Sequence, residues 1–177
     1  MDFLKEYNKH QSYLKEHINL QSERQKKEIV VALIHFCFIL PSFKGLVKEH
    51  IGREVQLDRF LDDFEAQNLD EYTVASAKAL GDEDPYADDF KEWDPLDLLV
   101  LNMFDYLLIE DRTQCVLRIL NGVIELLDYY HQFSDRPQYW SHLLQTELLR
   151  QKEILKSEKV RYDLYTKVYS SEMFQIG

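Results

Sequence analysis

The densest group of metal-binding residue types lies between Gly81 and Phe90, where five carboxylates lie close together. They are Asp82, Glu83, Asp84, Asp88 and Asp89. Calcium prefers carboxylate oxygens, but an EF-hand loop also needs a central glycine and a final glutamate at fixed spacing. This stretch has neither at the required positions. We therefore expect a solvent-exposed loop here and no metal site.

The six histidines are dispersed along the chain and form no metal-binding motif. They are His10, His17, His35, His50, His131 and His142. Helical bundles that hold two metal ions typically repeat Glu-x-x-His on two helices, and this sequence contains no Glu-x-x-His. His35 lies in an apolar run and is expected to be a hydrogen-bonded core residue.

Asp97, Asn102 and Asp105 interrupt a stretch that is otherwise apolar. Buried carboxylates are costly unless they are paired. One interpretation is that these residues line a pocket with Asp128 and His131, as in a small-molecule- or metal-binding bundle. The other is that they form a narrow solvent-exposed stripe on a central helix.

Motifs of the common enzyme classes are absent from the sequence. There is no Gly-x-Gly-x-x-Gly, no phosphate-binding loop, no Gly-x-Ser-x-Gly and no Cys-x-x-Cys. We therefore expect a protein that is not an enzyme, with no catalytic residue and no cofactor. Cys37 and Cys115 each lie in an apolar run and are predicted to be buried free thiols.

Helical spacing of apolar residues dominates the chain. Leu57, Phe60, Leu61 and Phe64, for example, recur at the spacing of one helix face. Capping residues predict helix starts at Ser22, Ser42, Asp94 and Asp111. The predicted helices run to about residue 20 and then cover 22–40, 42–52, 55–64, 70–80, 96–109, 111–130 and 138 to at least 159.

These elements predict an all-α fold, with residues 1–177 forming a single helical domain. We expect a bundle of about seven helices around a central antiparallel hairpin, made by the apolar segments 96–109 and 116–130. Residues 29–40 are rich in β-forming residues, so a buried strand is the alternative there. Tyr162, Tyr165 and Tyr169 lie at helical spacing near three basic residues, Lys159, Arg161 and Lys167. Such interleaving could stack nucleic-acid bases, but the acidity of the chain favours a stripe that faces the core.

Neither a secretory signal nor an apolar run long enough to span a membrane is visible, which predicts a cytoplasmic protein. The longest apolar run covers residues 29–40. A membrane span needs about 20 residues.

Negative charge is concentrated in one part of the sequence. Residues 54–94 hold 14 acidic and 3 basic residues, which gives the net charge of −11 that the whole chain carries. Such a surface repels nucleic acid and attracts basic proteins. The residues predicted to bind a basic partner are Asp58, Asp62, Asp63, Glu65, Asp82, Glu83, Asp84, Asp88 and Asp89.

The leading hypothesis is therefore a protein-interaction module, in its most concrete form an immunity protein against a cationic toxin. Two alternatives remain open. One is the small-molecule- or metal-binding bundle, and the other is a homodimer with a structural role. In either case the acidic stretch would only keep the protein soluble.

The order of segments resembles the YjaG-like family, which consists of bacterial proteins of unknown function with an all-helical fold. The similar segments are 39–43, 57–64, 94–130 and 143–155, which include Ile39-Leu40-Pro41-Ser42-Phe43 and Leu57-Asp58-Arg59-Phe60. The resemblance implies an all-helical fold and a bacterial cytosolic protein. It implies no activity.

Overall fold

The computed structural model describes residues 3–81, 86 and 92–175, and the regular structure within these ranges is helical. In this part of the chain there are eight α-helices, one short 3-10 helix and no strand. They are α1 (Phe3–Ile18), α2 (Glu23–Ile39), α3 (Phe43–Ile51), α4 (Leu57–Glu65), α5 (Asp70–Gly81), α6 (Pro95–Leu107), α7 (Arg112–Phe133), α8 (Pro137–Ile154) and η1 (Ser171–Phe174). The predicted all-α fold is confirmed. The strand considered for residues 29–40 is instead part of α2.

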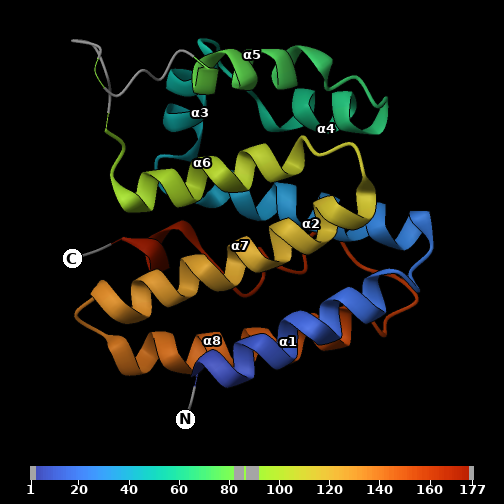
Figure 1. Cartoon of the computed structure of the whole chain (residues 1–177), viewed down its shortest axis with the longest axis vertical. Coiled ribbons are helices and arrows are strands. Elements are labelled where there is room, and N and C mark those ends of the chain that lie inside the picture. The colour runs from blue at the N-terminus through green and yellow to red at the C-terminus, as the bar shows by residue number, and fades with distance from the viewer. Residues whose placement is uncertain (1–2, 82–85, 87–91, 176–177) are drawn as a thin grey trace.

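The helices are arranged around α7, the longest of them. It packs against α1, α2, α6 and α8, while α3 packs against α5 and α6. Figure 1 shows α1 and α8 on one side of α7 and α2 and α6 on the other. The short helices α3, α4 and α5 gather at the far end (Figure 1). α6 and α7 lie side by side and run in opposite directions.

Several helices begin at the capping residues that the sequence predicted. The Ser22 side chain accepts a hydrogen bond from the Gln25 backbone N–H, and the Gln25 side chain bonds back to the Ser22 backbone. Asp94 caps α6 and Asp111 caps α7 in the same manner, each accepting from a backbone N–H in the first turn. These bonds satisfy amide groups that have no partner within their own helix.

Two predicted features at helix ends are wrong. Ser42 precedes α3, but its φ of 63° places it in the left-handed region and its side chain makes no capping bond. α8 ends at Ile154, before the predicted Lys159, and the following residues form turns. Tyr165 and Tyr169 are nevertheless buried, whereas Tyr162 is 60% exposed, so the predicted core-facing row of tyrosines holds for two of three.

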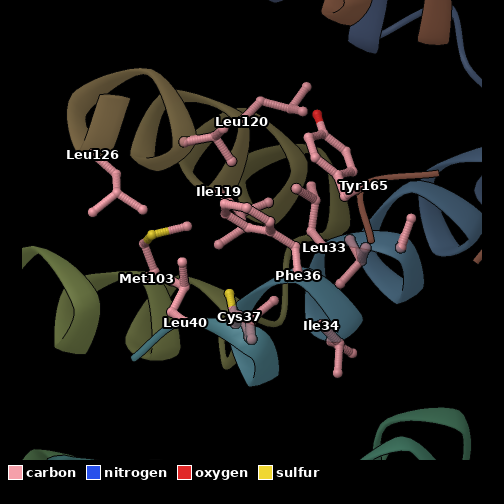
Figure 2. Packing of buried hydrophobic residues seen from close by; sticks show 14 of the residues in the cluster. Leu33, Ile34, Phe36, Cys37, Leu40, Met103, Ile119, Leu120, Leu126 and Tyr165 are labelled. Carbon is pink, nitrogen blue, oxygen red and sulfur yellow. The ribbon is translucent and has the colours of Figure 1, made fainter. Parts of the chain in front are cut away.

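One hydrophobic core connects the helices. Figure 2 shows Phe36 and Cys37 of α2 close to Met103 of α6 and Ile119 of α7. Tyr165, from the segment after α8, reaches the same cluster, with its ring centroid 5.5 Å from that of Phe36. Because this segment supplies core side chains, it is part of the folded body.

The two cysteines are buried free thiols, as predicted. Burial raises the pKa of both thiols, that of Cys115 to about 11. A thiol is unreactive in this state because the thiolate is the nucleophile.

Among the described residues, no single helix combines the length and apolar composition needed to cross a bilayer. α2 and α3 satisfy those two criteria only when they are taken together, and they meet at an angle of 98°.

Candidate functional site

A pocket of about 770 Å³ opens between α5 and the turn that joins α6 to α7. We call it the α5–α7 pocket. The start of α2 and the connection between α4 and α5 complete its wall. It is lined by Glu23, Gln67, Leu69, Asp70, Thr73, Ser76, Ala77, Leu80, Asp105, Leu108, Ile109, Glu110 and Arg112.

Three polar side chains from three helices meet at the wall of this pocket. Ser76 Oγ of α5 donates a hydrogen bond to Asp105 Oδ1 of α6, at 2.5 Å. His50 of α3 lies behind them, with Nε2 3.1 Å from Ser76 Oγ and 3.7 Å from Asp105 Oδ1. Ser76 and His50 are buried, whereas the Asp105 side chain is 23% exposed. The carboxylate is therefore the member of the group that a ligand can reach.

This group differs from a serine–histidine nucleophile. In a nucleophilic pair the serine proton points to the histidine, which acts as the base. Here the hydroxyl proton is directed to Asp105, so Ser76 Oγ accepts from the His50 ring. The arrangement holds the Asp105 carboxylate in a fixed orientation and suits binding better than acyl transfer.

The charge of the pocket is strongly negative. Glu23, Asp70, Asp105 and Glu110 contribute carboxylates and Arg112 contributes the one cation of the lining. The Arg112 guanidinium lies over the ring of Phe64, 4.3 Å from its centroid. Within the described residues, no lysine or arginine forms an ion pair with Asp70, Asp105 or Glu110. Glu23 pairs with Lys26 at 2.8 Å, so among the described residues three carboxylates of the lining remain without a lysine or arginine partner beside apolar walls.

The predicted acidic residues are only partly at the surface. Asp58, Asp62 and Glu65 are exposed on α4, and Glu65 pairs with Lys27 of α2 at 3.5 Å. Asp63 is buried, so it is not part of an exposed surface. Its carboxylate accepts hydrogen bonds from Tyr72 Oη at 2.7 Å and from Arg59 Nε at 3.1 Å. Asp82, Glu83, Asp84, Asp88 and Asp89 lie outside the described residues.

The residues of the alternative small-molecule or metal pocket do not share one site in the structure. Asp105 lines the α5–α7 pocket, but Asp128 accepts a hydrogen bond from Gln132, and His131 Nδ1 lies 2.9 Å from the Pro137 carbonyl. The described part of the chain holds no group of three or more His, Cys, Asp or Glu residues placed to bind a metal.

The histidine expected in the core is also placed differently. His35 is half-buried, with its ring centroid 5.1 Å from that of the exposed Tyr162. The buried histidines are His10 and His50. The search for histidines in apolar runs missed His10 and His50, because both lie among mainly polar neighbours in the sequence.

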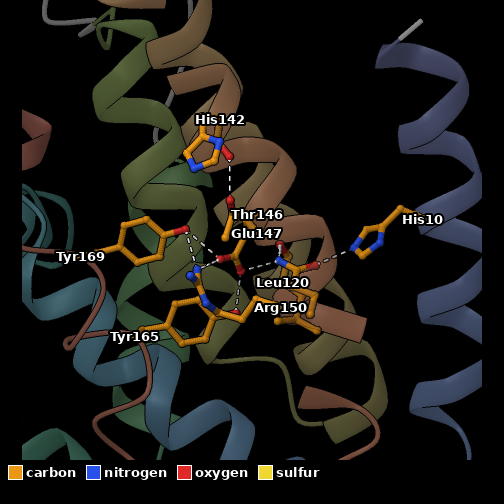
Figure 3. Close-up of polar contacts among 9 residues, drawn as sticks. His10, Leu120, His142, Thr146, Glu147, Arg150, Tyr165 and Tyr169 are labelled. Carbon is orange, nitrogen blue, oxygen red and sulfur yellow. Dashed lines mark hydrogen bonds and ion pairs between the residues drawn. The ribbon is translucent and has the colours of Figure 1, made fainter. Parts of the chain in front are cut away.

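Sequence reasoning missed the most buried charged cluster, which is centred on Glu147 of α8 (Figure 3). This side chain is completely buried. Its carboxylate accepts hydrogen bonds from Tyr165 Oη and Tyr169 Oη, each at 2.8 Å, and from Gln151 Nε2 at 3.1 Å. It also pairs with Arg150. A signal was available, since Leu144, Glu147, Leu148 and Gln151 share one helix face.

The Glu147 cluster joins distant parts of the chain. Gln151 also donates to the Leu120 carbonyl of α7 at 2.9 Å and bonds to His10 of α1 at 2.8 Å. Burial raises the pKa of Glu147, while Arg150 and the hydrogen bonds from Tyr169, Tyr165 and Gln151 oppose that shift. Because no atom of Glu147 reaches the surface, we assign the cluster to holding the C-terminal segment in place.

No protein-family model matches this chain, and no curated protein or solved structure with detectable similarity to it was found. The resemblance to the YjaG-like family therefore stays a prediction.

Proposed function

We propose that this protein is a non-enzymatic interaction module that binds a basic partner protein on an acidic surface. The surface consists of the exposed carboxylates of α4 and α5 together with the α5–α7 pocket. Its described members are Asp58, Asp62, Glu65, Asp70, Glu71, Asp105 and Glu110. The observation that carries the proposal is that three carboxylates of the pocket lining, Asp70, Asp105 and Glu110, have no lysine or arginine partner among the described residues.

The physics of association favours a basic partner. A surface with one sign of charge steers an oppositely charged protein and raises its association rate, and salt weakens this effect. A pocket that combines apolar walls with carboxylates can also hold the partner after the encounter, because burial of apolar area adds affinity that salt does not screen.

The concrete form of this proposal is a bacterial immunity protein that covers the cationic surface of a toxin domain. Such a role requires no catalytic group in this chain, which agrees with the lack of a nucleophile–base pair at Ser76, His50 and Asp105. The acidic residues 82–84 and 88–89 belong to the same stretch of sequence and remain predicted partner-binding residues.

Affinity capture with two matched variants tests the proposal. The first variant combines Asp58→Asn, Asp62→Asn and Asp70→Asn on the proposed surface. The control combines Glu16→Gln, Glu153→Gln and Glu158→Gln, which remove the same amount of charge from exposed positions elsewhere. From a lysate of the source cells, we expect the wild type and the control to retain a basic protein at low salt, and the surface variant to lose it.

Mass spectrometry identifies the retained protein, and a high-salt wash should release it. Equal retention by the two variants would contradict the proposed surface. Failure to retain any salt-sensitive basic protein would contradict the function. Thermal unfolding of each variant confirms that it is folded before capture.

A further inference from the structure

We propose that the α5–α7 pocket receives a lysine side chain of the partner, with the lysine ammonium group beside the Asp105 carboxylate. This inference rests on the proposed function and names the part of the partner that enters the pocket. The pocket volume of about 770 Å³ leaves room for one long side chain and some backbone of the segment that carries it.

Asp105 is prepared to accept a single cation. Its Oδ1 is held by Ser76 at 2.5 Å, and His50 approaches the same oxygen at 3.7 Å. Within the described residues nothing donates to Oδ2, although the side chain is 23% exposed. A fixed carboxylate with one free oxygen is a suitable acceptor because little conformational entropy remains to be lost on binding.

The walls of the pocket match the stem of a lysine. Leu69, Leu80, Leu108 and Ile109 line it together with the carboxylates. Lysine buries its aliphatic stem along apolar surface while its charged end stays with polar groups. Leu80 is 50% exposed and therefore has area that an incoming stem can cover.

Two features favour lysine over arginine. A guanidinium binds best when two carboxylate oxygens accept from it in parallel, whereas an ammonium acts as a compact point charge. Here one oxygen of Asp105 is already occupied by Ser76. Guanidinium groups also stack on aromatic rings, and the Phe64 ring is already covered by Arg112.

Asp70 and Glu110 extend the negative potential toward the entrance. Both residues line the pocket and both are exposed. No described cation pairs with either of them. They are expected to guide the ammonium group toward Asp105, and Asp105 is expected to hold it.

The probe for the test is a synthetic peptide, acetyl-Gly-Ala-Lys-Ala-Lys-Ala-Gly-amide, added to the isotope-labelled full chain at low salt. Two further peptides carry arginine or acetyl-lysine at the lysine positions. Amide chemical shifts report the place of binding and their titration gives the affinity. We expect the lysine peptide to shift the signals of Ala77, Leu80 and Ile109, and the acetyl-lysine peptide to leave them unchanged.

Matched variants separate the pocket from the surrounding charge. Asp105→Asn keeps an oxygen that can accept from Ser76 but removes the negative charge, and it should weaken binding about tenfold. Asp62→Asn removes the same charge from the exposed face of α4 and should weaken binding by less than about twofold. If Asp105→Asn fails to fold, Glu110→Gln at the exposed entrance replaces it, with about a threefold loss expected.

The outcomes distinguish this inference from the proposed function. Shifts confined to α4, with equal effects of Asp105→Asn and Asp62→Asn, would overturn lysine insertion and leave an acidic interaction surface standing. Equal binding of the arginine peptide in the pocket would overturn the preference for lysine. Complete lack of binding by the lysine peptide at low salt would count against lysine insertion, while the capture experiment still decides the proposed function.

Discussion

Glu147 shows how a single buried charge is accommodated. Removing a carboxylate from water costs several kcal/mol, and hydrogen bonds and an ion pair must compensate for that cost. Glu147 has two tyrosine hydroxyls, an amide and the Arg150 guanidinium as donors. Arg150 in turn donates to Tyr169 Oη at 3.0 Å. Loss of Glu147 removes the acceptor that both tyrosine hydroxyls and Arg150 share in the interior.

We therefore expect Glu147→Ala to lower the free energy of unfolding by about 3–5 kcal/mol, because Arg150 and both tyrosines lose their acceptor. Glu153→Ala on the exposed side of the same helix is the control and should change it by less than about 0.5 kcal/mol. Urea unfolding followed by circular dichroism measures both. Similar midpoints for the two variants would show that the cluster does not stabilise the fold.

The same cluster predicts a loss of stability in alkali. Burial, assisted by Glu147, raises the pKa of Tyr165 and Tyr169 above the ordinary value of 10.0. The folded chain thus keeps two protons that the unfolded chain releases. The stabilisation that these two protonated hydroxyls give to the folded chain is complete below pH 10.0. It is lost as the pH rises toward the pKa values of the two tyrosines in the folded chain.

Urea unfolding from about pH 9 to about pH 11 checks this prediction. The advantage of the wild type over Tyr165→Phe should shrink as the pH rises. Tyr162→Phe, at an exposed side chain, should follow the wild-type curve. A constant difference between wild type and Tyr165→Phe would contradict the assignment.

The sequence could predict that Glu147 shares a helix face with leucines, but it could not supply the partners. Tyr165 and Tyr169 lie 18 and 22 residues further along the chain. They reach the carboxylate because the chain turns back after α8, and that turn depends on tertiary contacts. A local pattern contains no information about such contacts.

Helix starts were predictable where a capping bond is local. Ser22 makes such a bond and Ser42 does not, although both directly precede the first residue of a helix. Ser42 follows Pro41 and takes a left-handed conformation with a φ of 63°, whereas Ser22 is extended, with a φ of −65° and a ψ of 157°. Residue type alone did not separate the two cases, because the backbone before the helix decides whether the hydroxyl can reach an amide.

This difference is measurable at the level of the two helices. Ser22→Ala should lower the free energy of unfolding by about 1 kcal/mol, because it removes the capping bond of α2. Ser42→Ala should change it by less than about 0.5 kcal/mol. Thermal or urea unfolding of the two variants makes the comparison. A larger loss at Ser42 than at Ser22 would contradict the observed caps.

The end of α8 was predicted too late for a different reason. Its charged residues continue past Ile154 and are compatible with a longer helix. Three hydrogen bonds from distant residues hold the chain after that point: Gln21 donates to the Leu155 carbonyl, Gln25 to the Ser157 carbonyl, and the Val160 amide to Glu28. Helix propensity is weak beside such contacts.

For the whole molecule, apolar periodicity was sufficient to predict an all-α fold. The concentration of negative charge was also readable from the sequence, and α4 presents Asp58, Asp62 and Glu65 at the surface. The α5–α7 pocket was not predicted. It forms where α3, α5 and α6 bring His50, Ser76 and Asp105 together, and these residues are far apart in the sequence.

Thiol labelling tests the integrity of the shared core. Cys37 and Cys115 are both 0% exposed, and burial raises the pKa of each. Iodoacetamide should therefore add no mass to the native protein over hours but should modify both cysteines in urea above the unfolding midpoint. Intact-protein mass spectrometry follows the reaction. Rapid labelling of one cysteine without urea would reveal local opening of the core.

The return of the chain after α8 has a consequence for synthesis on the ribosome. Tyr165, Tyr169 and Phe174 are translated after α8, yet Phe174 packs against Phe36 and Trp140 in the interior. In a nascent chain that ends at residue 160, the space that Phe174 occupies is empty. The Glu147 carboxylate also lacks the hydroxyls of Tyr165 and Tyr169 as donors. Protease resistance of stalled chains should therefore appear only once residue 174 has emerged, and until then we expect the exposed interior to attract chaperones.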